Sequence, residues 1–164
     1  NKGLVDKAVS EYGAEAVGLD EIYDVDADVY SPCALGGTVN EDTLPRLKAK
    51  VICGAANNQL ANNAIGDEVA KRGILYAPDY AVNAGGVMNV ALEMTGYNRE
   101  RAMRQMRTIY HNLTRIFEIA ERDGIPTYRA ADRMAEERID VMGKLKLPLG
   151  RTTPRFQGRI RGGA

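Results

Sequence analysis

The chain has 164 residues, with 22 basic and 22 acidic side chains, and 45% of its residues are hydrophobic. These proportions are those of one globular domain and exclude a disordered, a collagen-like or a repeat protein. No apolar run approaches the roughly 18 residues of a membrane span, no signal peptide is visible, and two cysteines favour a reducing compartment, so we expect a cytoplasmic protein.

The first half of the chain alternates helical and strand patterns. Apolar residues at helical spacing predict a helix over residues 2–12 that ends at Gly13. Short apolar runs predict strands at residues 14–17, 28–33, 49–56 and 73–77. Helical pieces are expected at 19–23 (capped by Asp20), at 43–47 (helix or turn) and at 59–72. This alternation is typical of a mainly parallel sheet with helices on both faces.

The second half of the chain is helical. Helices are predicted from Gly85 to Gly96, over 98–122, and from a Thr127 cap to Ile139. The apolar face of the middle helix includes Met103, Tyr110 and Ile116, and that of the last includes Ala131, Met134 and Ala135. These faces require a surface to cover, either the sheet edge or a partner domain.

The end of the chain is basic. From residue 143 onward there are six basic side chains and no acidic one, whereas the rest of the chain carries 16 basic and 22 acidic side chains. We expect a solvated, flexible segment at 141–164. Because no known nucleic-acid-binding motif accompanies these arginines, we do not expect nucleic-acid binding.

Three predicted strand ends carry unusual chemistry, and ligands of open α/β sheets bind outside the carboxyl ends of the strands. The first, residues 31–37, brings small residues and two glycines that let a ligand approach the backbone; an ordinary loop is the simpler interpretation. The second, 54–58, ends in Asn57 and Asn58, whose amides offer donors and acceptors. One of these asparagines could instead cap the next helix.

The third strand end, residues 77–87, places Asn83 before a Gly85–Gly86 step that opens a helix. A helix N-terminus exposes N–H groups and partial positive charge, so an α-carboxylate could bind nearby. A glycine-containing turn is the alternative. Cys33 and Cys53 lack metal-ligand spacing, and we expect no metal site.

Together these segments resemble the Glu/Leu/Phe/Val dehydrogenase family, most closely its leucine-specific members. The resemblance is carried by residues 28–36, 50–60, 73–80, 83–87, 97–99 and 130–139. It implies an α/β fold: an incomplete Rossmann-type, doubly wound parallel sheet followed by C-terminal helices. Residues 1–86 would be the second part of the NAD-binding domain, 87–140 the helices that complete it and line the cleft, and 141–164 the basic tail.

The family implies NAD-dependent, reversible oxidative deamination of an L-amino acid to the 2-oxo acid and ammonia. By this resemblance the cofactor is bound by Cys33, Ala34, Leu35, Ala56, Asn57 and Asn58. Which of the two neighbouring asparagines faces the nicotinamide stays open. The substrate would be bound by Asn83, Gly85, Gly86, Val87 and Val90.

Val87 and Val90 lie three residues apart on one helix face, and the matching positions line the substrate pocket in the leucine-type enzymes. An apolar pair would leave a buried γ-carboxylate unpaired, at a cost of several kcal/mol, so we favour leucine or another branched-chain substrate over glutamate. Phenylalanine or valine dehydrogenase is the alternative within the family. A non-catalytic binding module that retains the fold is the alternative outside it.

Several family features are absent from this chain. It contains no GxGxxG, and the family's catalytic lysines and aspartate belong to an N-terminal substrate domain, so no catalytic residue is assigned here. We therefore expect the chain alone to be inactive and to function with that domain. The family also implies a homo-oligomer.

Overall fold

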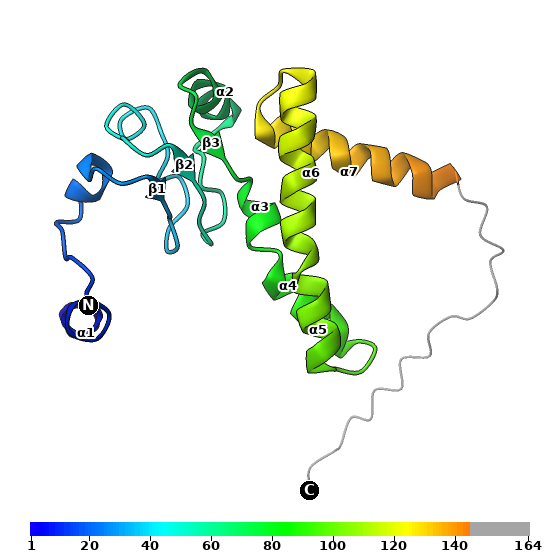
Figure 1. Ribbon diagram of the computed structural model, residues 1–164, viewed down its shortest axis with the longest axis horizontal. Helices are drawn as coiled ribbons and strands as arrows, with labels where there is room; N and C mark the ends of the chain where they lie inside the picture. Colours follow the sequence, from blue (N-terminus) through cyan, green and yellow to red (C-terminus); the bar gives the residue numbers. More distant parts are fainter. Residues whose placement is uncertain (145–164) are drawn as a thin grey trace, which may run out of the picture.

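The computed structural model describes residues 1–144 (Figure 1). Its elements in chain order are α1 (Lys2–Tyr12), the 3-10 helix η1 (Glu21–Asp24), β1 (Val29–Tyr30), β2 (Val51–Ile52), α2 (Asn63–Lys71), β3 (Leu75–Tyr76), α3 (Asp79–Val82), α4 (Gly85–Glu93), α5 (Arg99–Met106), α6 (Thr108–Asp123) and α7 (Thr127–Lys144). The strands form a parallel sheet in the order β1-β2-β3, as the alternating pattern predicts.

The sheet and α2 enclose the main hydrophobic core. Its buried members are Val39, Leu44, Ile52, Ile65, Val69, Tyr76 and, from α7, Tyr128. A side-chain oxygen of Asn62 caps α2 by accepting the Ile65 N–H at 3.0 Å. The predicted start of this helix at residue 59 is wrong, because Leu60 pairs with Val39 in a parallel bridge before the chain turns into α2.

The first helix forms as predicted. Asn1 accepts the Leu4 N–H at its start, and Gly13 ends it with a left-handed backbone, φ 67°. Every residue of α1 is exposed or half-buried, and the helix lies apart from the sheet (Figure 1).

The strand predicted at 14–17 is wrong, since these residues are exposed coil in the structure. A strand requires a neighbour to pair its backbone groups, and none of the three described strands pairs with this segment. Asp20 occupies the N-cap position of η1, as predicted, but its side chain makes no capping hydrogen bond. The Glu21 carboxylate accepts the Gly18 N–H at 2.8 Å. The segment between β1 and β2 folds as turns rather than as a crossover helix, so the expectation of helices on both faces is only partly met.

The predicted long helix 98–122 is two helices, α5 and α6, joined at Arg107, which keeps a helical backbone. At the join, the Thr108 hydroxyl donates to the Gln105 carbonyl at 2.6 Å. A second core, in which α6 packs on α7, is formed by Ile116, Ile119, Ala130 and Ala131. Met103 and Tyr110, predicted to face inward, are exposed.

The last helix, α7, continues to Lys144, beyond its predicted end. Thr127 does not cap it, because its hydroxyl donates to the Tyr76 carbonyl of β3 at 2.6 Å. Ala131 is buried as predicted, whereas Ala135 is exposed. The predicted basic tail is helical up to residue 144, and its remainder lies outside the described residues.

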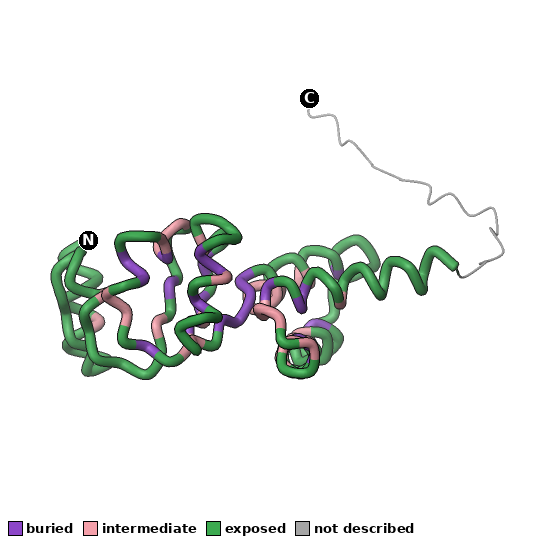
Figure 2. The backbone as a smooth tube through the Cα atoms, turned by 90° about the horizontal axis from the view of Figure 1, so that it is seen from above, coloured by how far each residue is buried: buried purple, intermediate pink, exposed green. Residues whose placement is uncertain are grey.

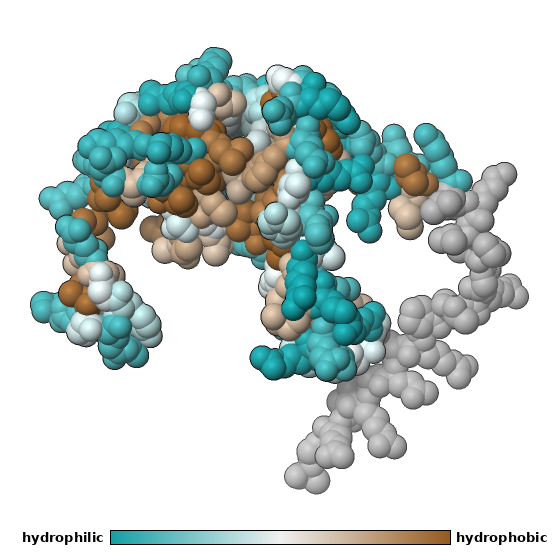
Figure 3. Space-filling view, viewed as in Figure 1, coloured by the Kyte–Doolittle hydropathy of each residue, from teal (hydrophilic) through white to brown (hydrophobic). Residues whose placement is uncertain are grey.

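Buried residues lie in and around the sheet and where the chain passes from β3 toward the C-terminal helices (Figure 2). The surface is hollowed between α1 on one side and α4 with α5 on the other, and apolar residues gather above this hollow (Figure 3). Across residues 1–144, no helix combines the length and apolarity needed to cross a bilayer.

The C-terminus of α6 supplies a pH-dependent contribution to stability. Asp123 binds Arg122 with a 2.7 Å Nε–Oδ1 distance and also contacts Arg133. Chiefly through the Arg122 hydrogen bond, these guanidinium groups lower the pKa of the Asp123 carboxyl from 3.8 to about 2. A lowered folded-state pKa contributes stability above the unfolded value, and this contribution is lost as the pH falls from about 4 to about 2.

We expect Asp123→Asn to lower stability at neutral pH, and we expect the difference from the unsubstituted chain to vanish as the pH falls through this range. Urea unfolding at a series of pH values measures it. A difference that is constant with pH would contradict the assignment.

Candidate functional site

The carboxyl ends of the three strands meet at one edge of the sheet, and the loops after β1 and β2 reach toward the hollow (Figure 1). Two backbone hydrogen bonds fasten these loops together. The Ala56 N–H donates to the Pro32 carbonyl at 2.9 Å, and the Gly37 N–H donates to the Asn58 carbonyl at 2.7 Å. The first two predicted strand ends therefore form one continuous surface.

Glycine is required where the two loops touch. A Cβ on Gly54 would lie 2.2 Å from the Pro32 carbonyl oxygen, and one on Gly36 would lie 2.6 Å from the Asn57 carbonyl oxygen. Backbone atoms cannot yield such space without moving a loop. Gly36, which we expected to give a ligand access to the backbone, is thus needed for the approach of the second loop.

The second and third strand ends meet through two asparagines. The Asn83 side-chain amide donates to Asn57 Oδ1 at 2.5 Å and lies 3.4 Å from the Ala55 carbonyl oxygen. Asn57 is exposed and Asn83 is half-buried, so their amides lie together at the surface. The structure therefore brings together two residues that the sequence singled out on separate loops.

The capping interpretation of Asn57 and Asn58 is wrong, since the cap of α2 is Asn62. Asn58 instead has a left-handed backbone, φ 53°, which asparagine tolerates better than most residues. This conformation accounts for the second asparagine, and the exposed side chain of Asn57 carries the link to Asn83.

Cys33, Ala34 and Leu35 lie exposed on the first loop, whereas Ala56 is buried on the second. A hydrogen bond with the backbone of Ala55 is the main cause that lowers the pKa of the Cys33 thiol. The Ser31 hydroxyl, 3.5 Å from the Cys33 sulfur, lowers it further. Most of these side chains are small, so they form a surface with few bulky groups on the loops next to the asparagines.

The predicted helix after the double glycine is α4, which follows the short, unpredicted α3 almost directly. The Gly86 N–H donates to the Asn83 carbonyl at 3.5 Å, so a part of the helix start is already bonded. Among the described atoms, a Cβ on Gly86 would meet nothing within 4 Å, and Gly86 has no positive φ. Neither packing nor backbone geometry explains this glycine, and the turn alternative does not require it.

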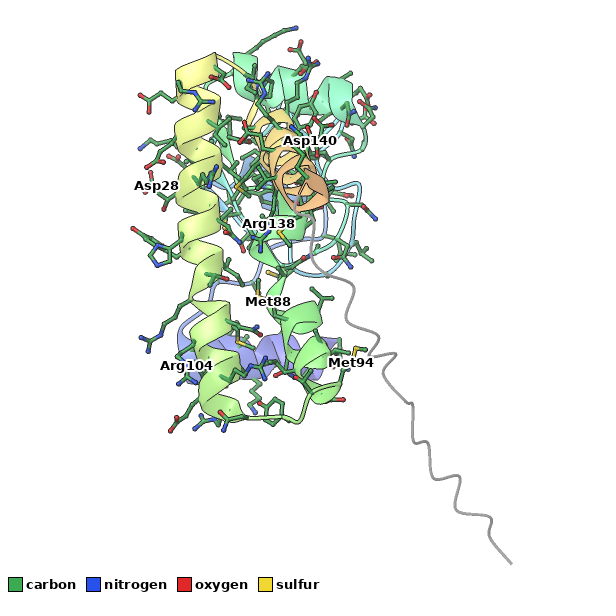
Figure 4. The ribbon with its side chains drawn as sticks, turned by 90° about the vertical axis from the view of Figure 1, so that its right-hand side faces the viewer. Asp28, Met88, Met94, Arg104, Arg138 and Asp140 are labelled. Carbon is green, nitrogen blue, oxygen red and sulfur yellow. The ribbon has the colours of Figure 1, made fainter. Side chains whose placement is uncertain are left out.

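Val87 and Val90 are 69% and 62% exposed on α4. Met88 of α4, Met94 directly after it and Arg104 of α5 lie in the same part of the molecule (Figure 4). The expected valine-lined substrate pocket is thus an open apolar surface in this chain. A pocket over these valines requires a second wall.

Two buried polar residues, Gln59 and Asp79, lie behind the asparagines, and the sequence patterns did not single them out. The Asp79 carboxylate accepts the Gln59 backbone N–H at 2.8 Å. Burial raises the pKa of the neighbouring Tyr76 to about 12, and its hydroxyl accepts the Asp79 N–H. The sequence held one signal for Gln59: it directly follows Asn57-Asn58 at the strand end, so it is a third polar residue in the same loop. Within residues 1–144, no group of three or more His, Cys, Asp or Glu is arranged to hold a metal ion.

Comparison with known proteins identifies the family of this chain. The model of the Glutamate/Leucine/Phenylalanine/Valine dehydrogenase family matches residues 1–143. The chain belongs to this family. The family membership predicted from the strand-end motifs is therefore confirmed.

Within the family, the chain is 57% identical over 148 residues to leucine dehydrogenase of Geobacillus stearothermophilus, covering 90% of this chain and 40% of that protein. It is 55% identical to valine dehydrogenase of Streptomyces coelicolor over 112 residues, which are 68% of this chain and 31% of that protein. The chain thus spans about 40% of the length of the leucine dehydrogenase that it matches.

Among solved structures, L-tryptophan dehydrogenase from Nostoc punctiforme superposes with a TM-score of 0.84 at 47% identity, covering 86% of this chain and 43% of that one. A hetero-hexameric glutamate dehydrogenase from Thermus thermophilus superposes with a TM-score of 0.64 at 22% identity, a likeness of fold alone. These neighbours confirm the predicted Rossmann-like α/β fold of this family member.

Proposed function

We propose that this chain is the part of an NAD-dependent amino-acid dehydrogenase that binds the nicotinamide and one side of the substrate. The complete protein would convert L-leucine, or another branched-chain L-amino acid, to its 2-oxo acid and ammonia. The observation that carries the proposal is the hydrogen bond between Asn57 and Asn83, which joins two strand ends beside the open glycine step of α4.

The residues of the strand-end loops have the chemistry that NAD requires. The nicotinamide carboxamide both donates and accepts hydrogen bonds, as do the amides of Asn57 and Asn58. Since Asn57 Oδ1 accepts the hydrogen bond from Asn83, the Nδ2 of Asn57 would donate to the nicotinamide carboxamide. The exposed Cys33, Ala34 and Leu35 would lie along the adenosine and ribose side. When bound, NAD supplies the acceptor for the hydride of the substrate α-carbon.

The start of α4 suits the amino acid. Gly85 and Gly86 leave the backbone accessible. The half-buried Asn83 lies two residues before Gly85, where its amide would orient the polar end of the substrate. Val87 and Val90 then offer an apolar surface to the substrate side chain. A glutamate γ-carboxylate buried there would lose its hydration without a partner, at a cost of several kcal/mol.

Val87 and Val90 are exposed in this chain. We therefore infer that residues 87–140 form the first wall of the cleft and that an N-terminal substrate domain forms the second. We assign the catalytic groups to that domain and propose a homo-oligomer. Leucine is favoured over tryptophan because the leucine dehydrogenase relative is 57% identical, against 52% for a tryptophan dehydrogenase of Nostoc punctiforme.

A substrate panel tests this function. The complete protein that contains this chain is assayed for NADH formation with L-leucine, L-valine, L-phenylalanine, L-tryptophan and L-glutamate. We expect the highest kcat/KM for a branched-chain amino acid and negligible turnover of glutamate. Preferred turnover of glutamate or of an aromatic amino acid would contradict the substrate assignment, and no turnover at all would favour a non-catalytic module.

A substitution at Val90 tests whether the apolar surface of α4 binds the substrate side chain. Because a few missing methyl groups in a substrate pocket are worth about 1–3 kcal/mol, we expect Val90→Ala to lower kcat/KM for leucine by roughly 10-fold or more. The bulkier phenylalanine should lose less, which shifts the ratio of the two kcat/KM values. Glu93→Ala, on an exposed position of the same helix, is the control and should leave the ratio unchanged. An unchanged ratio in Val90→Ala would remove Val90 from the pocket.

A further inference from the structure

Gln59 and Asp79 form a buried polar pair directly behind the two asparagines. Gln59 is 0% exposed and Asp79 is 6% exposed. The Gln59 Nε2 donates to the carbonyls of Gly54 and Ala56, at 2.6 and 3.0 Å. One side chain therefore fixes the loop that carries Asn57 at two points, from the inside.

The same pair reaches the loop that carries Asn83. The Gln59 backbone N–H donates to Asp79 Oδ2 at 2.8 Å, and the other carboxylate oxygen accepts the Tyr80 N–H at 2.6 Å. The Asp79 carbonyl accepts the Asn83 N–H at 2.8 Å, one helical turn further along α3. A continuous chain of hydrogen bonds thus runs from the loop of Asn57 to the backbone of Asn83.

Stability alone does not account for this pair. A buried carboxylate and a buried amide carry a desolvation cost, and apolar residues of similar volume would fill the same space without it. Within the described residues, the Gln59 Oε1 is buried with no hydrogen-bond partner, which adds to this cost. What the pair supplies is a fixed distance between two loops.

We propose that Gln59 and Asp79 are positioning residues of the dehydrogenase site, which hold Asn57 and Asn83 in register for the nicotinamide and the amino acid. This inference rests on the proposed function. Neither residue touches the ligands; both act through the asparagines. A shift of about 1 Å in a group that positions reactants costs on the order of 100-fold in rate, so the expected effects are kinetic.

The experiment uses the complete protein with NAD and L-leucine. Gln59→Met keeps the length of the side chain but removes both donors to the loop. We expect kcat to fall 10- to 100-fold, and we expect the isotope effect with α-deuterated leucine to increase, because hydride transfer becomes slower than product release. Thr43→Val is the matched control: Thr43 is a buried polar residue of the turn before β2, so this variant should lose stability but keep both kinetic values.

Asp79 provides the second test. Asp79→Asn keeps one of the two acceptor oxygens and should retain more of kcat than Asp79→Ala, which keeps neither. If a folded Gln59→Met protein has the kcat and the isotope effect of the unsubstituted protein, the positioning role is wrong, while the proposed function stays intact. If all three variants fail to fold, the pair is structural only and the inference is wrong. If the unsubstituted protein does not oxidise leucine, it is the proposed function that fails.

Discussion

Replacing Asn83 with alanine in the complete protein is expected to lower kcat/KM for L-leucine by about 100-fold or more. The removed amide is the one that joins the loop after β2 to the start of α4, through Asn57. Removing one pre-oriented donor from an active site costs on the order of 100- to 1,000-fold in rate. Because Asn83 is only half-buried, the melting temperature should change little. Steady-state kinetics and a thermal melt measure the two effects.

The partner residue makes this test specific. Asn57→Ala should produce a similar loss, and the double variant should lose little more than either single variant, because the two amides act as one unit. Asn63→Ala is the control, since Asn63 is an exposed asparagine of α2, away from the strand ends. Losses in kcat/KM that multiply in the double variant would show that the two asparagines act independently.

Replacing Gly54 with alanine is expected to destabilise the fold by about 3 kcal/mol, the upper end of the cost of overpacking. The new Cβ would lie 2.2 Å from the Pro32 carbonyl oxygen and 2.6 Å from the Pro32 nitrogen. Both neighbours are backbone atoms, so the loops after β1 and β2 have to separate. Urea unfolding of the chain measures the loss.

Gly143→Ala is the matched control for Gly54→Ala. Gly143 lies in α7, and among the described residues a Cβ there would meet no heavy atom within 4 Å. Alanine is the better helix former by about 1 kcal/mol, so this variant should be unchanged or more stable. Equal stability of the Gly54 and Gly143 variants would contradict the close approach of the two loops.

Helices were predictable from the sequence because their periodicity and end signals are local. The predicted helix 2–12 agrees with α1 at both ends, since Asn1 and Gly13 supply its caps. The strand at 14–17 failed for the opposite reason, because strand pairing depends on a neighbour that local patterns do not specify. The start of α2 was missed because the bridge between Val39 and Leu60 is a contact between distant residues.

The candidate site was predictable in outline, because the carboxyl ends of parallel strands meet at one edge. Asn57 and Asn83 were identified on separate loops, and the structure joins them. The roles of Gln59 and Asp79 were not predictable, since a buried amide and a surface amide look the same in a sequence. The pocket that the family resemblance implies over Val87 and Val90 is not formed within residues 1–144, since both valines are exposed there.

A structure of the complete protein with NADH and the 2-oxo acid of leucine, in the absence of ammonia, tests most directly whether these loops hold the reactants. Without ammonia the reduced cofactor and the oxo acid cannot react, so both stay in place. We predict the nicotinamide against the amides of Asn57 and Asn58, and the branched side chain of the oxo acid against Val87 and Val90. A nicotinamide bound away from Asn57, Asn58 and Asn83 would contradict the account.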